Sequence, residues 1–249
     1  MSQLVQILGL SLIGSVAGLV GGAIFLFKRD WAEKLCLFAV PFAAGVLLST
    51  SLLHLLPEAV AGIGNDAFLI VLIALLSSFF FEQYFARLHH HEHQHSSRVK
   101  SSVPLVILGD TIHNFIDGVA IASAFLVEPR FGLVVTLATF LHEVPHEVGD
   151  FGILMSAGWS RAKTFTVNFL SALATFPGAL MVFYLMRDAE EKIGLLLAVS
   201  AGVFLYLGAS DFLPEVGEHR DGVAAWKKFL PLVFGAVVMY LLTLVIPEH

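Results

Sequence analysis

Residues 4–27 read LVQILGLSLIGSVAGLVGGAIFLF, and this stretch contains no charged side chain. A helix needs about 20 apolar residues to cross the hydrocarbon core of a bilayer, so the stretch is long enough to span one. No basic residue precedes it, whereas a cleaved signal peptide begins with a positively charged region. We therefore expect a retained membrane-spanning helix at the start of the chain.

The apolar character continues along the whole chain. Hydrophobic residues make up 57% of the 249 residues and charged residues 14%, against about 45–50% and roughly 25% in soluble domains. The mean hydropathy is +0.83. Seven more apolar segments of spanning length lie at 34–57, 66–88, 103–127, 131–157, 164–186, 193–214 and 229–246. The sequence predicts an all-α, polytopic protein of the lipid bilayer, a single transmembrane domain over residues 1–249 with eight helices.

The basic residues are distributed unevenly between the two ends of this expected bundle. Three lie in the even-numbered loops, Arg130, Arg187 and Lys192, and eleven lie in the odd-numbered loops: Lys28, Arg29, Lys34, Arg87, Arg98, Lys100, Arg161, Lys163, Arg220, Lys227 and Lys228. Because cytoplasmic loops carry an excess of Lys and Arg, we expect the odd-numbered loops in the cytoplasm and both termini outside. A cytoplasmic (plasma) membrane is the simplest location.

The third loop, at about 89–100, is rich in histidine: His89, His90, His91, His93 and His95. Neutral imidazole is a good ligand for borderline cations, so such a tract can bind metal loosely. The pattern fits either a plain solvated loop or a cytoplasmic loop for metal capture or regulation. We expect no ordered site there.

The fourth apolar segment carries ionisable residues that are costly in hydrocarbon. His113 and Asp117 are four residues apart, so they lie on one face of a helix, and Asp110 extends the same stripe. Asn114 sits about 100° further round the helix. Such residues face a bundle interior, pair with a partner or coordinate an ion. An internal His–Asp hydrogen bond would explain this helix if it stood alone.

The fifth apolar segment makes a purely structural explanation hard to keep. Five ionisable residues fall within nine positions: His142, Glu143, His146, Glu147 and Asp150. His142, His146 and Asp150 repeat every four residues and therefore share one helix face. Pro145 removes a backbone hydrogen bond in their midst, and such a break is tolerated where it lines a polar cavity. The segment therefore fits an ion pathway.

Together the two segments predict an intramembrane site for a divalent metal ion. One candidate ligand set is His113, Asp117, His142 and His146, and a second set to one side is Asn114, Glu143 and Glu147. Two neighbouring ions, or one ion with alternative positions, would explain so many ligands. Mixed imidazole and carboxylate ligands favour Zn²⁺ first, and they also admit Cd²⁺, Fe²⁺, Mn²⁺ and Co²⁺.

Several other polar residues are candidates for the pathway or for secondary sites. His54 precedes the pair Pro57–Glu58, and Asp211 precedes the similar pair Pro214–Glu215. This similarity suggests an inverted repeat that relates helices one to three to helices six to eight, around helices four and five. The two ends are either rims of a metal route or ordinary interfacial helix ends. Asn168 is a weaker candidate ligand, because a lone amide more often joins two helices by a hydrogen bond.

Two motifs together are typical of a known family: His113-Asn114-Phe115-Ile116-Asp117-Gly118 and His142-Glu143-Val144-Pro145-His146-Glu147. With them the chain closely resembles the ZIP (Zrt/Irt-like) metal transporters, and within them the histidine-rich branch. The similarity extends to residues 54–58, to the histidine-rich loop and to Pro214–Glu215, and so covers effectively the whole chain. The resemblance implies eight helices, outside termini, a homodimer, and alternating access that carries zinc into the cytoplasm. It also implies a binuclear centre made of the two ligand sets given above, in which one residue can bridge the two ions.

Two other functions remain open. His142-Glu143-Val144-Pro145-His146 satisfies the H-E-x-x-H pattern of an intramembrane zinc metalloprotease. Pro145 and the surplus of ligands argue against it, because a catalytic zinc must keep one position open for water. A metal sensor or an uncoupled channel would use the same ligands. We expect a transporter and not an enzyme, without a catalytic cofactor and without nucleic acid as a partner.

Overall fold

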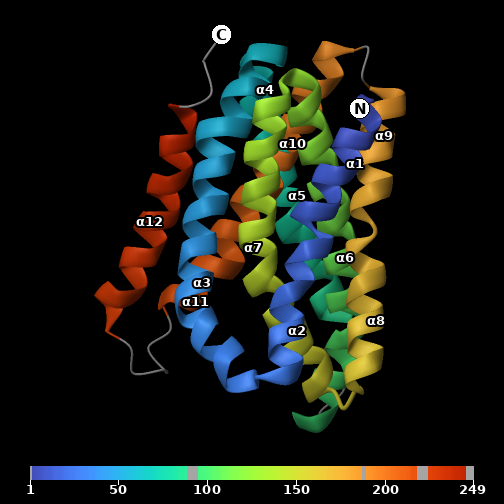
Figure 1. Cartoon of the computed structure of the whole chain (residues 1–249), viewed down its shortest axis with the longest axis vertical. Coiled ribbons are helices and arrows are strands. Elements are labelled where there is room, and N and C mark those ends of the chain that lie inside the picture. The colour runs from blue at the N-terminus through green and yellow to red at the C-terminus, as the bar shows by residue number, and fades with distance from the viewer. Residues whose placement is uncertain (1, 89–94, 187–188, 218–223, 245–249) are drawn as a thin grey trace.

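The computed structural model describes residues 2–88, 95–186, 189–217 and 224–244. Within these ranges the regular elements are all helices, and they join end to end into eight rods that run along the long axis of the molecule (Figure 1). An all-α fold is therefore confirmed. The segment boundaries expected from the apolar runs agree with the rods to within a few residues in most places, because the length of an apolar run sets the length of its helix.

The first five rods are continuous or nearly so. The first rod consists of α1 (Gln3–Gly14), the short 3₁₀ turn η1 (Val16–Leu19) and α2 (Val20–Phe27). The second consists of α3 (Arg29–Thr50), the π-helical segment η2 (Ser51–Leu55) and α4 (Leu56–Ile63). The next three are single helices, α5 (Asp66–Leu88), α6 (His95–Val127) and α7 (Pro129–Ser156). Pro145 lies inside α7, which stays helical on both sides of it.

The last three rods complete the bundle. They comprise α8 (Arg161–Ala172) and α9 (Thr175–Leu185); α10 (Glu190–Tyr206), the π-helical segment η3 (Leu207–Phe212) and α11 (Leu213–Gly217); and α12 (Ala225–Thr243). The helix α1 begins and α12 ends at the same end of the bundle (Figure 1). This arrangement agrees with an even number of passes along the chain.

Seven of the rods are long and apolar enough to cross a membrane. The rod that is not among them, α7, has 28 residues and is long enough, but its histidine and carboxylate side chains make it more polar. The count of eight spans and the inverted repeat stay predictions. The two π-helical segments lie just before Pro57–Glu58 and Pro214–Glu215, the two places that suggested the repeat.

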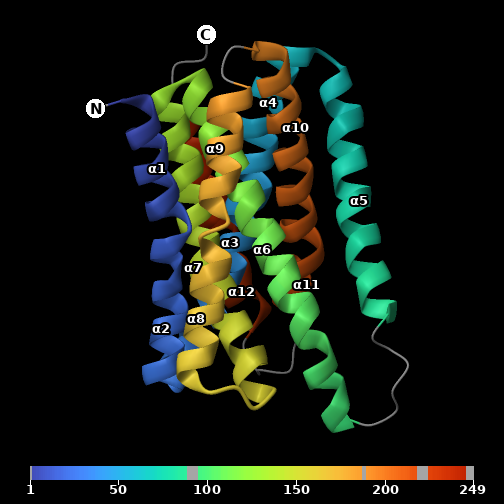
Figure 2. The same ribbon diagram turned by 90° about the vertical axis from the view of Figure 1, so that its right-hand side faces the viewer.

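The helices that carry the ionisable motifs are central, whereas α5 and α12 are peripheral. In Figure 2, α5 stands at one edge of the bundle, and it packs mainly on α10. The helix α12 packs on α3 at another edge. Only 17% of each of these two spans is buried, against 50% of the span of α6. The helix α7 packs against α1, α2, α3 and α6, so its polar side chains face protein and not lipid.

Close backbone packing fixes α6 against α9. A Cβ atom on Gly118 would lie 1.9 Å from the carbonyl oxygen of Thr175, and a Cβ atom on Gly178 would lie 2.1 Å from that of Phe115. Small residues allow helices to approach closely in membranes, where van der Waals packing holds them together. The part of α6 that bears His113 and Asp117 therefore has a rigid support behind it.

Candidate metal centre

Four side chains from α6 and α7 converge on one point in the middle of the bundle. They are His113, Asp117, His142 and Glu143, and one ligand atom of each lies within 4.8 Å of all the others. We call this group the buried cluster, because no member is more than 5% exposed. The Nε2 atom of His113 lies 3.1 Å from Nε2 of His142, 3.0 Å from Oε1 of Glu143 and 3.7 Å from Oδ2 of Asp117.

Local helical geometry produces this convergence. His113 and Asp117 are one turn apart on α6, and His142 faces them from α7, with its Nε2 3.5 Å from Oδ2 of Asp117. The Nδ1 atom of His142 donates to the carbonyl oxygen of Ala138 at 2.9 Å. A carbonyl only accepts, so the proton of the neutral ring is on Nδ1 and the lone pair of Nε2 points into the cluster. This is the orientation that a metal-binding imidazole needs.

The carboxylates of the buried cluster have no hydrogen-bond partner among the described residues. This holds for both oxygens of Asp117 and both oxygens of Glu143, since the 3.0 Å approach of His113 lacks hydrogen-bond geometry. Two buried carboxylates that accept no hydrogen bond are destabilising, and only the imidazoles of His113 and His142 lie within 4.0 Å of them as basic groups among the described residues. A divalent cation would neutralise their two charges and use the two imidazole lone pairs. The residues therefore fit such an ion.

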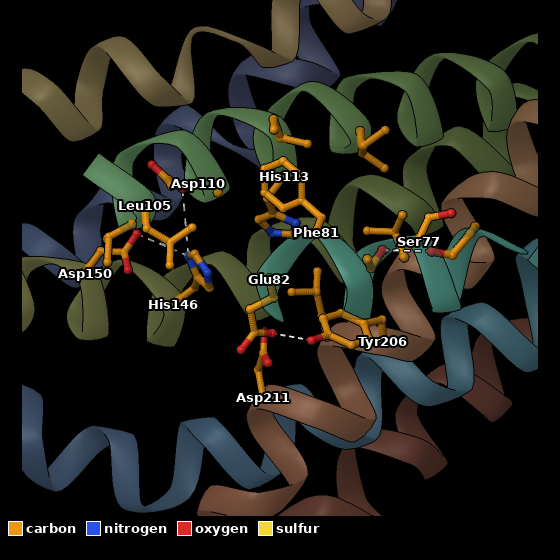
Figure 3. Close-up of a pocket in the computed structure, with 18 of the residues that line it drawn as sticks. Ser77, Phe81, Glu82, Leu105, Asp110, His113, His146, Asp150, Tyr206 and Asp211 are labelled. Carbon is orange, nitrogen blue, oxygen red and sulfur yellow. Dashed lines mark hydrogen bonds and ion pairs between the residues drawn. The ribbon is translucent and has the colours of Figure 1, made fainter. Parts of the chain in front are cut away.

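A second group lies next to the first. The side chains of Asp110 on α6 and of His146 and Asp150 on α7 also bring their ligand atoms within 4.8 Å of one another. The Nδ1 atom of His146 lies 3.9 Å from Oδ1 of Asp110 and 3.8 Å from Oδ2 of Asp150 (Figure 3). The rings of His146 and His113 are 5.1 Å apart between centroids, so the two groups adjoin.

A cavity of about 610 Å³ opens beside this second group, between α5, α6, α7 and α10. Asp110, His146 and Asp150 all line it, and we therefore call them the cavity-facing cluster. Of the buried cluster only His113 lines the cavity. The opposite wall carries the acidic residues Glu82 and Asp211, and the hydroxyl of Tyr206 donates to Glu82 (Figure 3).

The structure divides the predicted ligands differently from the sets that the resemblance implied. Glu143 lies with His113, Asp117 and His142, whereas His146 lies with Asp110 and Asp150. Glu147 is fully buried and its oxygens have no hydrogen-bond partner in the described part of the chain, but it belongs to neither cluster. Metal binding by these residues stays a prediction.

Asn114 is held by hydrogen bonds on both sides of its amide. Its Nδ2 donates to Oδ1 of Asp110 at 2.8 Å and to the carbonyl oxygen of Asp110 at 3.1 Å. Its Oδ1 accepts from the hydroxyl of Ser15 and, at 3.4 Å, from that of Thr175. Asn168 donates to the carbonyl oxygen of Thr164 in its own helix and lies in neither cluster.

The remaining candidates lie away from the two clusters. The Nε2 atom of His54 is 3.0 Å from the carbonyl oxygen of Met239, and Glu58 is half-buried on α4. Asp211 is exposed at the cavity wall. The side chains of Glu215 and His95 and the residues His89, His90, His91 and His93 lie outside what the structure describes.

The sequence reading did not select Ser15, Thr175 or Glu82. Apart from Asp66 at its start, the apolar segment 66–88 has one carboxylate, and this was a usable signal for Glu82, because an ionisable residue in a span is usually functional. Ser15 and Thr175 gave no comparable signal, since hydroxyl residues are common in membrane helices.

Fold and centre together define a polytopic helical membrane protein with imidazole and carboxylate ligands buried between two spans. A family profile described as ZIP Zinc transporter matches residues 3–104 and 86–243. The chain therefore belongs to the ZIP zinc transporter family.

Individual relatives share part of their length with this chain. It is 41% identical to human zinc transporter ZIP4 over 144 residues, which is 56% of this chain and 22% of that protein. It is 34% identical to zinc transporter ZIP13 of Pongo abelii over 219 residues, or 82% of this chain and 65% of that protein. Mouse zinc transporter ZIP10 is 37% identical over 149 residues, 56% and 18% of the two chains. The chain thus spans less than two thirds of each of these relatives.

Proposed function

We propose that this protein carries divalent transition-metal ions, zinc first, across a membrane and into the cytoplasm, and that the ion passes between α6 and α7. The observation that carries the proposal is the buried cluster. Two imidazole nitrogens and two carboxylates from two helices meet there within 4.8 Å, and the carboxylates have no hydrogen-bond partner among the described residues. An ion of charge +2 supplies what this arrangement lacks.

The ligand types support a transition metal over Mg²⁺ or Ca²⁺. Magnesium and calcium take oxygen ligands almost exclusively, whereas zinc accepts nitrogen and oxygen in a four-coordinate shell. The buried cluster offers two of each. Geometry alone does not separate Zn²⁺ from Cd²⁺, Fe²⁺, Mn²⁺ or Co²⁺, and we place zinc first because the relatives are named as zinc transporters.

The position of the cavity supports movement toward the cytoplasm. Its walls include Glu82 near the end of α5, Leu105 near the start of α6 and Ile153 near the end of α7. These helix ends adjoin the odd-numbered loops, and the excess of basic residues in those loops favours a cytoplasmic location for them. A cation in the buried cluster therefore has its open side toward that compartment, with both termini outside and a plasma membrane as the setting.

The opposite side of the buried cluster is closed by packed apolar side chains. Ile121 on α6 and Val135 on α7 are fully buried there, and Phe131 is 3% exposed. An ion that arrives from outside therefore requires α6 and α7 to shift against their neighbours, as in alternating access. His54, whose ring stacks on Phe131 at 6.5 Å, and Glu58 would border that outer route. The family resemblance adds a homodimer to this proposal.

The grouping of the ligands favours a transporter over a protease. An H-E-x-x-H protease holds one zinc ion with both histidines and keeps the glutamate free to activate water. Here His142 shares a cluster with Glu143, and His146 belongs to the other cluster. A sensor would bind the ion in the same way but would not pass it on.

Flux separates these functions. The purified protein in proteoliposomes should take up Zn²⁺, read by a dye inside the vesicles, and His142→Ala and Asp117→Ala should abolish uptake. Equilibrium zinc binding should be measured in parallel with uptake. For that binding measurement His54→Ala is the matched control, because it removes a buried histidine outside both clusters. Peptide cleavage without uptake would make the protein a protease, and tight binding without uptake would make it a sensor.

A further inference from the structure

We infer that one end of the bundle binds anionic phospholipids of the surrounding leaflet through three pairs of a tryptophan and a lysine. The pairs are Trp31 with Lys28, Trp159 with Lys163, and Trp226 with Lys227. We call them the Trp–Lys pairs. The inference concerns the lipid around the protein and is independent of the metal centre.

In each Trp–Lys pair the lysine ammonium lies over the indole ring. The distances from Nζ to the ring centroid are 3.6 Å over Trp159, 4.8 Å over Trp31 and 5.6 Å over Trp226. A cation within about 6 Å of an indole centroid is attracted by the negative face of the ring. Each pair therefore presents an apolar plate and a positive charge side by side.

All three pairs lie at the same end of the bundle, and they account for all three tryptophans of the chain. Trp31 is in the first turn of α3, Trp226 is in the first turn of α12, and Trp159 lies two residues before α8. These three helices begin at the end that carries the odd-numbered loops, and α12 and α8 stand on opposite sides of the bundle (Figure 1). The pairs therefore surround this end and do not form a single patch.

The pairs are open to the lipid headgroups. Trp31 is 67% exposed and Trp226 is 60% exposed, and the lysines of all three pairs are exposed. In the described part of the chain, none of these three ammonium groups forms an ion pair with a carboxylate. An indole favours the boundary between hydrocarbon and water, and an ammonium at that depth favours an anionic headgroup. A lipid phosphate therefore supplies the missing negative charge, while its acyl chains cover the ring.

The aromatic side chains at the other end lack this arrangement. Tyr184 near the end of α9 and Tyr240 near the end of α12 are both exposed. Among the described residues, no Lys or Arg lies over either ring. Aromatic residues are common at both faces of a membrane, so the rings alone do not select a lipid. The lysines give the end with the Trp–Lys pairs a preference for anionic lipid.

Quenching of tryptophan fluorescence by brominated lipids tests the inference, since the three tryptophans all belong to the pairs. The full-length protein is placed in phosphatidylcholine vesicles with equal fractions of brominated phosphatidylglycerol or brominated phosphatidylcholine. Wild type should prefer phosphatidylglycerol by about fivefold, the effect of one lysine near an anionic surface. The combined variant Lys28→Gln, Lys163→Gln and Lys227→Gln should show no preference, and Lys192→Gln at the other end should keep it. A wild type without a preference, or a combined variant that retains it, would overturn the inference.

A single pair separates direct contact from general attraction to a basic surface. With Trp31→Phe and Trp226→Phe, only Trp159 fluoresces. In that background Lys163→Gln should abolish the preference, whereas Arg161→Gln, which removes an exposed cation that lies over no described ring, should keep it. Equal losses in both variants would mean that net charge alone acts and would overturn the inference. Inorganic phosphate at constant ionic strength should leave the quenching unchanged, and a fall would make the pairs a site for free anions instead of lipid.

Discussion

The buried and cavity-facing clusters are built by the same two helices from the same side-chain types, yet their surroundings differ. The buried cluster offers four candidate ligands, and all of them are enclosed. The cavity-facing cluster has three, and a cavity of about 610 Å³ lies beside them. An enclosed and complete ligand shell favours tight and selective binding. An incomplete shell that water can enter favours exchange. A transport route needs a position that binds the ion selectively, followed by a position from which the ion can exchange with water.

The two histidines of α7 show the same contrast. His142 is fixed by the bond from its Nδ1 to the carbonyl oxygen of Ala138. His146 has no such bond to its Nδ1 within the described residues, and its ring lies 5.1 Å from that of His113 and 6.3 Å from that of Phe212 between centroids. A tethered imidazole holds an ion in place, whereas an untethered one can turn with it. We expect changes in the buried cluster to affect binding more than changes around the cavity-facing cluster.

The largest effect is expected from His142→Ala. It leaves Asp117 and Glu143 close together with fewer ligands for the ion, and breaking a buried charged arrangement costs about 3–5 kcal/mol. Zinc affinity should fall by roughly 10²–10⁴-fold, since 1.4 kcal/mol corresponds to about a factor of ten. Isothermal titration calorimetry measures the change. His54→Ala should bind zinc like wild type, and an equal loss in that control would mean that any buried histidine matters.

A smaller effect is expected from Gly118→Ala, which pushes α6 away from α9. The new Cβ atom would meet the carbonyl oxygen of Thr175, and overpacking of this kind costs about 1–3 kcal/mol. Thermal unfolding in detergent should show reduced stability, and the buried cluster should lose zinc affinity more than the cavity-facing cluster. Gly109→Ala on the same helix meets no atom within 4 Å and should lower neither quantity. Equal behaviour of the two variants would contradict the close packing of α6 and α9.

Ser15→Ala should have a modest effect that is confined to an ion bound by the cavity-facing cluster. It removes one hydrogen bond to Asn114, worth about 1 kcal/mol, so the affinity for that ion should fall about fivefold. Competition between Cd²⁺ and a chelating dye can resolve such a change. Ser15→Thr keeps the hydroxyl and should retain wild-type affinity. A loss that affects an ion of the buried cluster equally would point to a general defect in packing.

The smallest effect is expected from the histidine-rich tract. Replacing His89, His90, His91, His93 and His95 by serine leaves both clusters intact, so zinc uptake in proteoliposomes should change by less than about threefold, as loose surface ligands adjust only delivery or regulation. If this replacement abolished uptake while His142→Ala did not, the main site would be in the loop.

The sequence predicted the helical fold, and the structure brings motif residues of α6 and α7 together, but the sequence did not predict how they group. Apolar length sets the helices, and four-residue spacing puts His113 and Asp117 on one face. Neither rule fixes the relative height of α6 and α7. Glu143 and His146 are three residues apart on α7, so a shift of about 4.5 Å along the helix axis, together with a rotation of α7, changes which of them faces the buried cluster.

Long-range contacts and backbone irregularities were beyond sequence reasoning for a related reason. Ser15 meets Asn114 across 99 residues of chain, and nothing local to either residue indicates the contact. The π-helical segments η2 and η3 depend on a shift of one residue in the backbone hydrogen bonds, and apolar periodicity does not register such a shift. By contrast, the carboxylate of Glu82 stood out in its apolar segment and was simply not selected.

The most direct test of a cation between α6 and α7 is the X-ray absorption spectrum of the protein loaded with one equivalent of Zn²⁺. We expect two imidazole nitrogens and two carboxylate oxygens at about 2.0–2.2 Å, and a change in this shell in Asp117→Asn but not in Asp211→Asn. A shell made of oxygen alone, or a spectrum unaffected by Asp117→Asn, would contradict the account.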